Sequence, residues 1–130
     1  MKDYVIIIVI LIIILAGAVY TKNFLNKTSE KMLGELKTLK EEISKSEENT
    51  NNDKAKELAT KICDEWCNIN HTLSVIVVHS ELDAIQIALA RTKAKIFEGE
   101  IKDSLEELEV AQFLIKNVAE KEKFNLKNIF

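Results

Sequence analysis

The sequence predicts an all-helical protein: an N-terminal transmembrane helix that runs into a juxtamembrane helix, followed by a three-helix antiparallel bundle made of helical hairpins. Three observations predict this fold class. The chain of 130 residues contains no proline and only three glycines. Leu, Ile, Ala, Glu and Lys dominate its composition, and these residues favour or tolerate helix. No residue pair typical of a β-hairpin turn stands between the apolar stretches.

Residues 4–20, "YVIIIVILIIILAGAVY", predict a membrane span. The stretch carries no charge, and twelve of its residues are Ile, Leu or Val, which favour insertion by about 4–7 kcal/mol. As a helix it is about 25 Å long, slightly less than the hydrocarbon core of about 30 Å. Tyr4 and Tyr20 stand where interfacial aromatic residues belong, and Val5, Ile10 and Leu15 lie between them.

The same segment has features of a signal peptide. Lys2 is a minimal positive region, residues 5–15 form an apolar region of ordinary length, and Ala16-Gly17-Ala18 fits a cleavage site. However, the chain after this site continues as amphipathic helix. We therefore expect an uncut transmembrane anchor over residues 1–22, and a cleaved, secreted helical protein is the alternative.

The orientation of the anchor depends on two opposing signals. Lys22, Lys27 and Lys31 follow the span, and counted alone they place the rest of the chain in the cytoplasm. A short N-terminal tail before a long domain is instead the usual signal-anchor layout, and long domains cross largely regardless of charge. We expect a single-pass protein of the cell membrane with an extracytoplasmic C-terminal domain.

Residues 23–47 predict a juxtamembrane, coiled-coil-like helix that continues the span. Its apolar positions alternate at three and four residues, which is the pattern of a coiled-coil seam. The seam can pack on the domain after it or on a second copy of the chain. Residues 47–53, "EENTNND", form a polar linker, and Asp53 is expected to cap the next helix. The seam consists of Leu25, Ser29, Met32, Leu36, Leu39, Ile43 and Ser46.

Residues 53–130 predict the helical bundle domain. An amphipathic stripe runs from Leu58 through Trp66 to Val77, so the first helix is expected to end near His79. Ser80 is expected to cap the second helix, and Gly99 to end it. The last helix runs to about residue 119, and the apolar tail is expected to dock on the bundle.

The candidate site residues have both structural and chemical interpretations. Cys63, Cys67 and His71 recur every four residues, so a zinc or copper site needing a further ligand is conceivable. The simpler interpretation is two small buried cysteines beside a flanking histidine. Four-residue spacing also separates the cysteine Cβ atoms by about 5–6 Å, whereas a disulfide needs about 3.8 Å. We expect no cofactor.

The residues near the start of the second helix of the bundle domain also have more than one possible role. His79, Glu81 and Asp83 could form an acid–base or pH-sensing cluster, or they could complement the dipoles of two helix ends. Arg91 is expected to be partly buried and to pair with Glu65 or Asp64, with anion binding as the alternative. Trp66 is expected to be a packing anchor, which is the role its place on the core stripe indicates.

Two stretches, "WCNINHTLSVIVVHSELDAIQIALARTKAKI" and "EKEKFNLKNIF", resemble a family of small, uncharacterised bacterial proteins common in clostridia and related Gram-positive bacteria. The resemblance covers nearly the whole chain and implies one N-terminal membrane helix. It implies no activity, because the family is a domain of unknown function. Besides the apolar run and the tail, the residues that carry it are Trp66, His79, Ser80, Glu81, Asp83, Leu89, Ala90 and Arg91.

The sequence therefore predicts a membrane-anchored structural or interaction protein. Its expected partners are the lipid bilayer and a protein, either itself or another membrane protein. The formal net charge of −3 and the single arginine indicate no nucleic-acid partner. A membrane-tethered module that binds a metal or small ligand is the alternative. We expect no enzyme, because no phosphate-binding loop, nucleophile elbow or metalloprotease motif is present.

Overall fold

Four helices make up the computed structural model, which describes residues 1–75 and 77–129, with side chains through Glu122. No strand occurs within those ranges, so the predicted all-α fold class is confirmed. The helices are α1 (Lys2–Ser44), α2 (Asp53–Leu73), α3 (His79–Glu98) and α4 (Ile101–Ile129).

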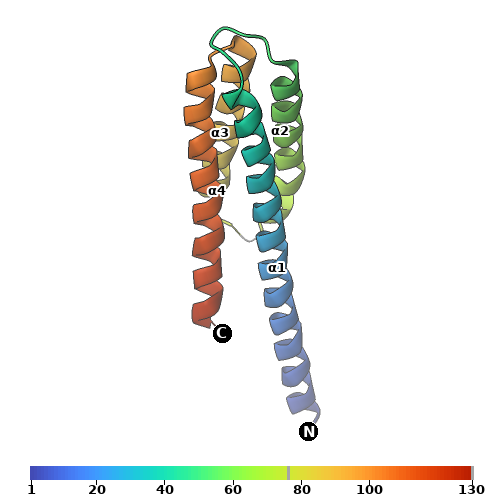
Figure 1. Ribbon diagram of the computed structural model, residues 1–130. Helices are drawn as coiled ribbons and strands as arrows, with labels where there is room; N and C mark the ends of the chain where they lie inside the picture. Colours follow the sequence, from blue (N-terminus) through green and yellow to red (C-terminus); the bar gives the residue numbers. More distant parts are fainter. Residues whose placement is uncertain (76, 130) are drawn as a thin grey trace.

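The helices run alternately up and down, and each packs against its two neighbours in a ring: α1 with α2, α2 with α3, α3 with α4, and α4 with α1 (Figure 1). The three helices predicted after the linker form as expected. The juxtamembrane half of α1 packs with them as a fourth helix, and it lies between α2 and α4. The short loops place sequential helices side by side, which is the usual topology of an up-and-down bundle.

The seam of α1 is buried in the bundle of its own chain. Leu36 and Ile43 are 0% exposed, and Leu25, Met32 and Leu39 join them in one core with residues of α2, α3 and α4. The seam was expected to pack either on the domain that follows it or on a second copy of the chain. In the structure it packs on the domain of its own chain. A juxtamembrane helix that is marginally stable alone is stabilised by this contact.

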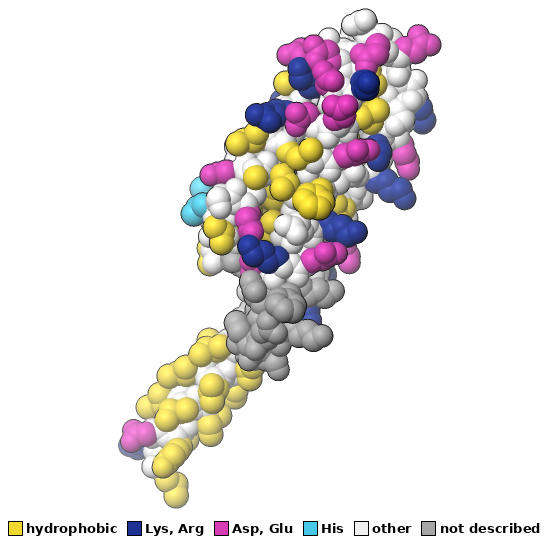
Figure 2. Space-filling model, turned by 90° about the vertical axis from the view of Figure 1, so that its left-hand side faces the viewer, with side chains coloured by type: hydrophobic (Ala, Val, Ile, Leu, Met, Phe, Trp, Pro, Cys, Tyr) yellow, Lys and Arg dark blue, Asp and Glu magenta, His cyan; other side chains and the backbone are white. Residues whose placement is uncertain are grey.

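The N-terminal half of α1 leaves the bundle as an isolated rod (Figures 1 and 2). The helix is unbroken from Lys2 to Ser44, as the sequence predicted. The large apolar side chains from Tyr4 to Leu15 are all exposed, and none of the apolar stretch is buried. The helix is long and apolar enough to cross a membrane, and a signal sequence would meet the same criterion.

At the end of the bundle far from the rod, the α1–α2 loop holds the α3–α4 turn. Gly99 adopts a left-handed backbone (φ 77°), and its carbonyl accepts a 2.9 Å hydrogen bond from the Asn49 amide. A Cβ on Gly99 would lie 3.3 Å from the Asn49 Cα, so glycine serves both the turn and this close approach. The Glu48 carboxylate accepts hydrogen bonds from the amides of Ile101 and Lys102 at 3.2 and 2.5 Å. It thereby caps the N-terminus of α4 from another loop.

Two predicted caps are wrong, each by one or two residues. Asn52, and not Asp53, is the N-cap of α2, where its Oδ1 accepts a 3.0 Å hydrogen bond from the Ala55 amide. The N-cap of α3 is Val78, and not Ser80, so Ser80 lies within the first turn. There the backbone carbonyl of Val78 accepts from the amide of Glu81 at 3.1 Å, and no side chain caps the helix.

The helix predicted to reach His79 ends earlier, at Leu73. Val77, expected on its apolar stripe, is buried but lies in the turn between α2 and α3. The reason is local, because β-branched residues crowd the sequence there and disfavour helix. At the other end, α4 continues to Ile129 instead of giving way to a separate tail. The expected docking of the tail lies outside the described side chains.

Candidate functional site

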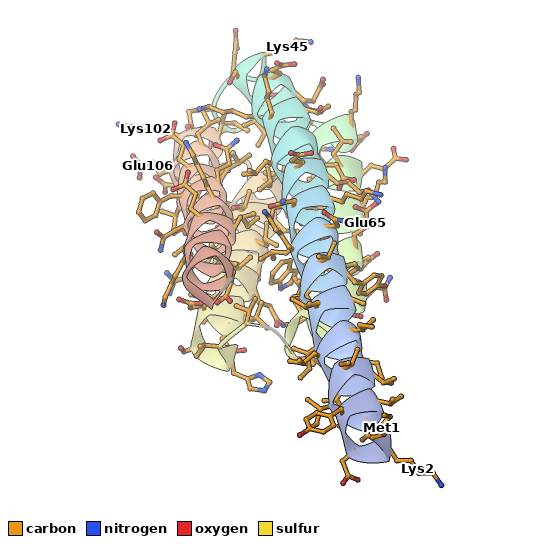
Figure 3. The ribbon with its side chains drawn as sticks, turned by 90° about the horizontal axis from the view of Figure 1, so that it is seen from below. Met1, Lys2, Lys45, Glu65, Lys102 and Glu106 are labelled. Atoms are coloured by element: carbon orange, nitrogen blue, oxygen red, sulfur yellow. The ribbon has the colours of Figure 1, made fainter. Side chains whose placement is uncertain are left out.

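Two carboxyl groups face each other where α1 and α2 pack. They belong to Glu35 on α1 and Glu65 on α2, and Figure 3 labels Glu65 at this contact. On each helix a lysine precedes the glutamate by one turn. Lys31 Nζ lies 4.0 Å from a Glu35 oxygen, and Lys61 Nζ lies 3.9 Å from a Glu65 oxygen. Both lysines are largely exposed, so these i,i+4 pairs neutralise the carboxyl groups only weakly.

The pair holds a proton near neutral pH. The Oε2 atoms of Glu35 and Glu65 are both buried, and neither has a hydrogen-bond partner among the described atoms. Burial raises the pKa of Glu35 to about 7, and the hydrogen bond that a protonated Glu35 can donate to Glu65, together with the negative charge of Glu65, adds to this rise. A proton on Glu35 donated to Glu65 satisfies both oxygens, as expected for two carboxyl groups that share one site.

We expect the pair to make the protein less stable as the pH rises. Between the ordinary pKa of 4.5 and the folded value of about 7, the folded chain binds more protons than the unfolded chain, so the free energy of unfolding falls. Solvent reaches a fifth of the Glu35 side chain, and with that screening the expected loss is about 1–2 kcal/mol. Glu35→Gln keeps a donor for Glu65 and should remove this loss. Urea unfolding at pH values on both sides of the interval measures the difference.

The matched control is Glu41→Gln, on the same helix but exposed. It should keep the pH dependence of the unaltered protein. Equal slopes for the unaltered protein and for Glu35→Gln would contradict the shared-proton account.

The predicted metal candidates do not come together. Among the described residues, no group of three or more His, Cys, Asp or Glu side chains is placed to hold a metal ion. Cys67 and His71 are exposed, whereas Cys63 is half-buried and its Sγ donates to the Leu89 carbonyl at 3.6 Å. Burial raises the pKa of the Cys63 thiol, which disfavours the thiolate that metal binding needs. Both cysteines are free.

The residues around the start of α3 separate into two environments. His79, Ser80 and Asp83 are exposed. Glu81 is partly buried, and its Oε1 accepts a 2.7 Å hydrogen bond from Lys121 on α4. The Glu81 carboxylate therefore connects α3 to α4. The sequence had suggested a cluster of Glu81 with His79 and Asp83, and this contact with Lys121 was not predicted.

Trp66 and Arg91 have opposite outcomes. Trp66 is buried in the core, as its place on the stripe predicted. Arg91 is exposed, so its expected burial is wrong. Its expected partner Glu65 pairs with Lys61 instead. A cavity of about 10 Å³ lies beside Trp66, lined also by Ser29 and Met32. It has room for about one water molecule and not for a larger ligand.

An apolar surface lies on the outward side of α3 and α4. Ile87 and Val110 are about half exposed, and Phe113 is 67% exposed. Ile85 on α3 and Ile115 on α4 line the same small cavity, so antiparallel packing sets Ile87 level with Phe113, with Val110 one turn farther from the rod. Figure 2 shows apolar side chains gathered on one side of the bundle. We call Ile87, Val110 and Phe113 the α3–α4 face.

Contacts on either side bound this face. On α3, Gln86 accepts from Asn70 of α2 at 3.5 Å, so that edge turns toward α2. On α4, Glu109 pairs with Lys40 of α1 at 3.2 Å, so that edge turns toward α1. The α3–α4 face lies between these two edges and has no such contact with α1 or α2 among the described residues.

Sequence reasoning missed the carboxyl pair and the α3–α4 face. Glu35 and Glu65 each directly precede a core residue, Leu36 and Trp66, and each follows a lysine by four residues. Those two regularities are the signal that could have located them. The exposed position of Phe113 has no such signal, because an apolar pattern alone does not say how wide the contact with neighbouring helices is.

The chain matches one family model. The model, described as Domain of unknown function (DUF4363), matches residues 19–129, which include the whole bundle. No curated protein matches the chain, and no solved structure does.

Proposed function

This chain belongs to the DUF4363 family, and from its own geometry we propose that it is a membrane-anchored helical interaction protein, not an enzyme. In this role the N-terminal half of α1 crosses the cell membrane once. The bundle stands beside the bilayer on the extracytoplasmic side and binds a protein through the α3–α4 face.

The observation that carries the proposal is the continuity of α1. One helix without a break contains both the exposed apolar rod and the buried seam. In water the rod would expose a continuous apolar surface far larger than soluble monomers tolerate. A bilayer removes that surface from water, and the seam then fixes the bundle directly to the span.

The α3–α4 face is the surface proposed for a partner. The seam is unavailable, because its apolar side chains are buried in this chain's own core. The α3–α4 face instead offers an exposed aromatic residue, Phe113, with two aliphatic neighbours. Interfaces are commonly centred on such a small group of apolar anchors surrounded by polar residues. A second copy of the chain and another membrane protein are the two kinds of partner to distinguish.

Purification of the tagged full-length protein from its native membrane in mild detergent tests the proposal. We expect a partner to co-purify with the unaltered chain and to be lost from a chain carrying Ile87→Ser and Phe113→Ser. Removing an anchor residue usually costs about 2 kcal/mol or more, which raises the dissociation constant at least tenfold and so lowers the recovery of the partner. The size of the complex tells a second copy from a different protein.

Phe97→Ser is the matched control. Phe97 is an aromatic residue of α3 that is also 50% exposed, but it lies toward α2, where Lys56 Nζ is 5.3 Å from its ring centre. This variant should keep the partner. Equal recovery with all three proteins would contradict partner binding at the α3–α4 face.

A further inference from the structure

The last turns of α4 extend beyond the level at which α2 and α3 end. Glu81, in the first turn of α3, accepts a 2.7 Å hydrogen bond from Lys121 of α4, so α3 begins level with Lys121. From there α4 continues as a helix to Ile129. Figure 1 shows α4 running past the turn between α2 and α3, in the direction of the rod. Among the described helices, α1 is the only other one that continues to this level.

One register relates α4 to the antiparallel α1. Lys40 of α1 pairs with Glu109 of α4 at 3.2 Å. Eleven residues back along α1 is Ser29, and eleven residues forward along α4 is Glu120. Ser29 and Glu120 line one shallow groove between the two helices. The same register therefore holds over three helical turns.

This register gives the level that the end of α4 reaches. Nine residues beyond Glu120 lies Ile129, and nine residues before Ser29 lies Tyr20. Ile129 is therefore level with Tyr20, which ends the apolar stretch of α1 and is the expected interfacial residue. The final turns of α4 thus run from the bundle to the edge of the proposed span.

The two segments that share this level carry positive charge and no negative charge. They are residues 20–26 of α1, with Lys22, and residues 123–129 of α4, with Lys123 and Lys127; neither range contains an aspartate or a glutamate. The chain as a whole is acidic, with a formal net charge of −3. Residues 123–129, "KFNLKNI", also mix their lysines with large apolar residues. Helices of such composition are stable at the surface of a membrane.

From this geometry we propose that residues 123–129 of α4 lie in the interfacial layer of the bilayer, with their lysines on anionic lipid headgroups. The protein then meets the membrane through both α1 and α4. The inference rests on the proposed anchoring by α1. Beyond the start of α3, α4 has one neighbouring helix instead of two, so its apolar residues need a further cover. A bilayer that begins at Tyr20 supplies this cover, and its anionic headgroups neutralise the lysines.

Tryptophan quenching in lipid nanodiscs tests this contact. The background is the full chain with Trp66→Phe, which removes the native tryptophan. The Trp66 Nε1 atom has no hydrogen-bond partner among the described atoms, so phenylalanine leaves no group unpaired. Phe124→Trp, Tyr20→Trp and Val110→Trp are then compared in nanodiscs of anionic lipid that carry a nitroxide on part of the headgroups. Val110 is half exposed and precedes Phe124 on the same helix by fourteen residues, a rise of about 21 Å.

We expect Phe124→Trp to be quenched several times more strongly than Val110→Trp and nearly as strongly as Tyr20→Trp. Strong quenching of Tyr20→Trp, with Phe124→Trp no more quenched than Val110→Trp, would overturn the inference and leave the anchoring intact. Absence of quenching from Tyr20→Trp as well would overturn the anchoring and the inference together. Leu126→Trp repeats the comparison at a second position of the segment, and it should behave like Phe124→Trp.

The same assay tests the lysines. Lys123→Gln and Lys127→Gln, added together to the chain with Phe124→Trp, should weaken the contact about fivefold for each charge removed and so reduce the quenching. The matched control is Lys45→Gln with Lys102→Gln, which removes two exposed lysines at the end of the bundle far from the rod. The control should leave the quenching unchanged. An equal effect of the two pairs would overturn the binding of anionic headgroups by α4.

Discussion

A chain carrying Ile8→Arg and Ile12→Arg is expected to leave the membrane fraction. Both side chains lie on the rod and are exposed. Each arginine costs about 2.5–3.5 kcal/mol near the centre of a span, and each lost isoleucine removes about 0.3–0.6 kcal/mol more. The sum of about 6–8 kcal/mol offsets the whole insertion energy of about 4–7 kcal/mol. The fraction of protein that sediments with membranes after an alkaline wash measures the effect.

The matched control places the same two charges on the same helix, within the bundle. Thr38→Arg and Ser44→Arg alter two exposed positions of α1, where each hydroxyl donates only to a backbone carbonyl one turn back. This chain should sediment like the unaltered one. If the chain with Ile8→Arg and Ile12→Arg also sediments fully, the rod is not what holds the protein to the membrane.

Leu36→Ala is expected to lower the free energy of unfolding by about 3–4 kcal/mol. The side chain is 0% exposed in the core that α1 shares with the other helices. Removing it loses the transfer energy of the side chain and leaves a cavity, a combination that costs about 2–5 kcal/mol in well-packed cores. Urea unfolding of the full chain in detergent, followed by the fluorescence of buried Trp66, measures the loss.

Leu33→Ala, a half-buried leucine on the same helix, is the control and should cost clearly less. The size of the Leu36→Ala effect should not depend on protein concentration, because the seam packs within one chain. A loss that grows as the protein is diluted would mean that the seam pairs two copies instead.

The helices were predictable because each carries a regular apolar stripe. The stripes of Leu36 on α1, Trp66 on α2 and Leu108 on α4 lie in the core where their spacing placed them. The unbroken α1 was equally predictable, since no proline or glycine pair interrupts it. The sequence did not decide between the seam's two possible partners, because a coiled-coil spacing fits either one.

The helix ends were less predictable, because they depend on contacts made elsewhere. Asn52 caps α2 while its side-chain amide donates to Ser46 at 2.6 Å, a contact that exists only once the loop is folded. Glu48 caps α4 across more than fifty residues of sequence. Neither contact has a local signature of the kind that identifies an N-cap or a glycine C-cap.

The carboxyl pair and the α3–α4 face depend on helix register. Glu35 meets Glu65 because the α1–α2 loop sets the level at which the two helices pack. Arg91 was expected to be partly buried and paired with a carboxylate of α2, yet the ring of four helices leaves that side of α3 in solvent. A stripe gives the direction of the core, but the number of neighbouring helices decides how far burial extends around each helix.

The central claim is that one uninterrupted helix, α1, both crosses the bilayer and supplies the first helix of the bundle. The most direct test is the intact mass of the protein recovered from alkaline-washed membranes of the cells that make it. The account predicts a chain of 14.8 kDa, with its N-terminal segment present, in the membrane pellet. A shorter chain that begins at Val19 and is recovered in the soluble fraction would contradict it.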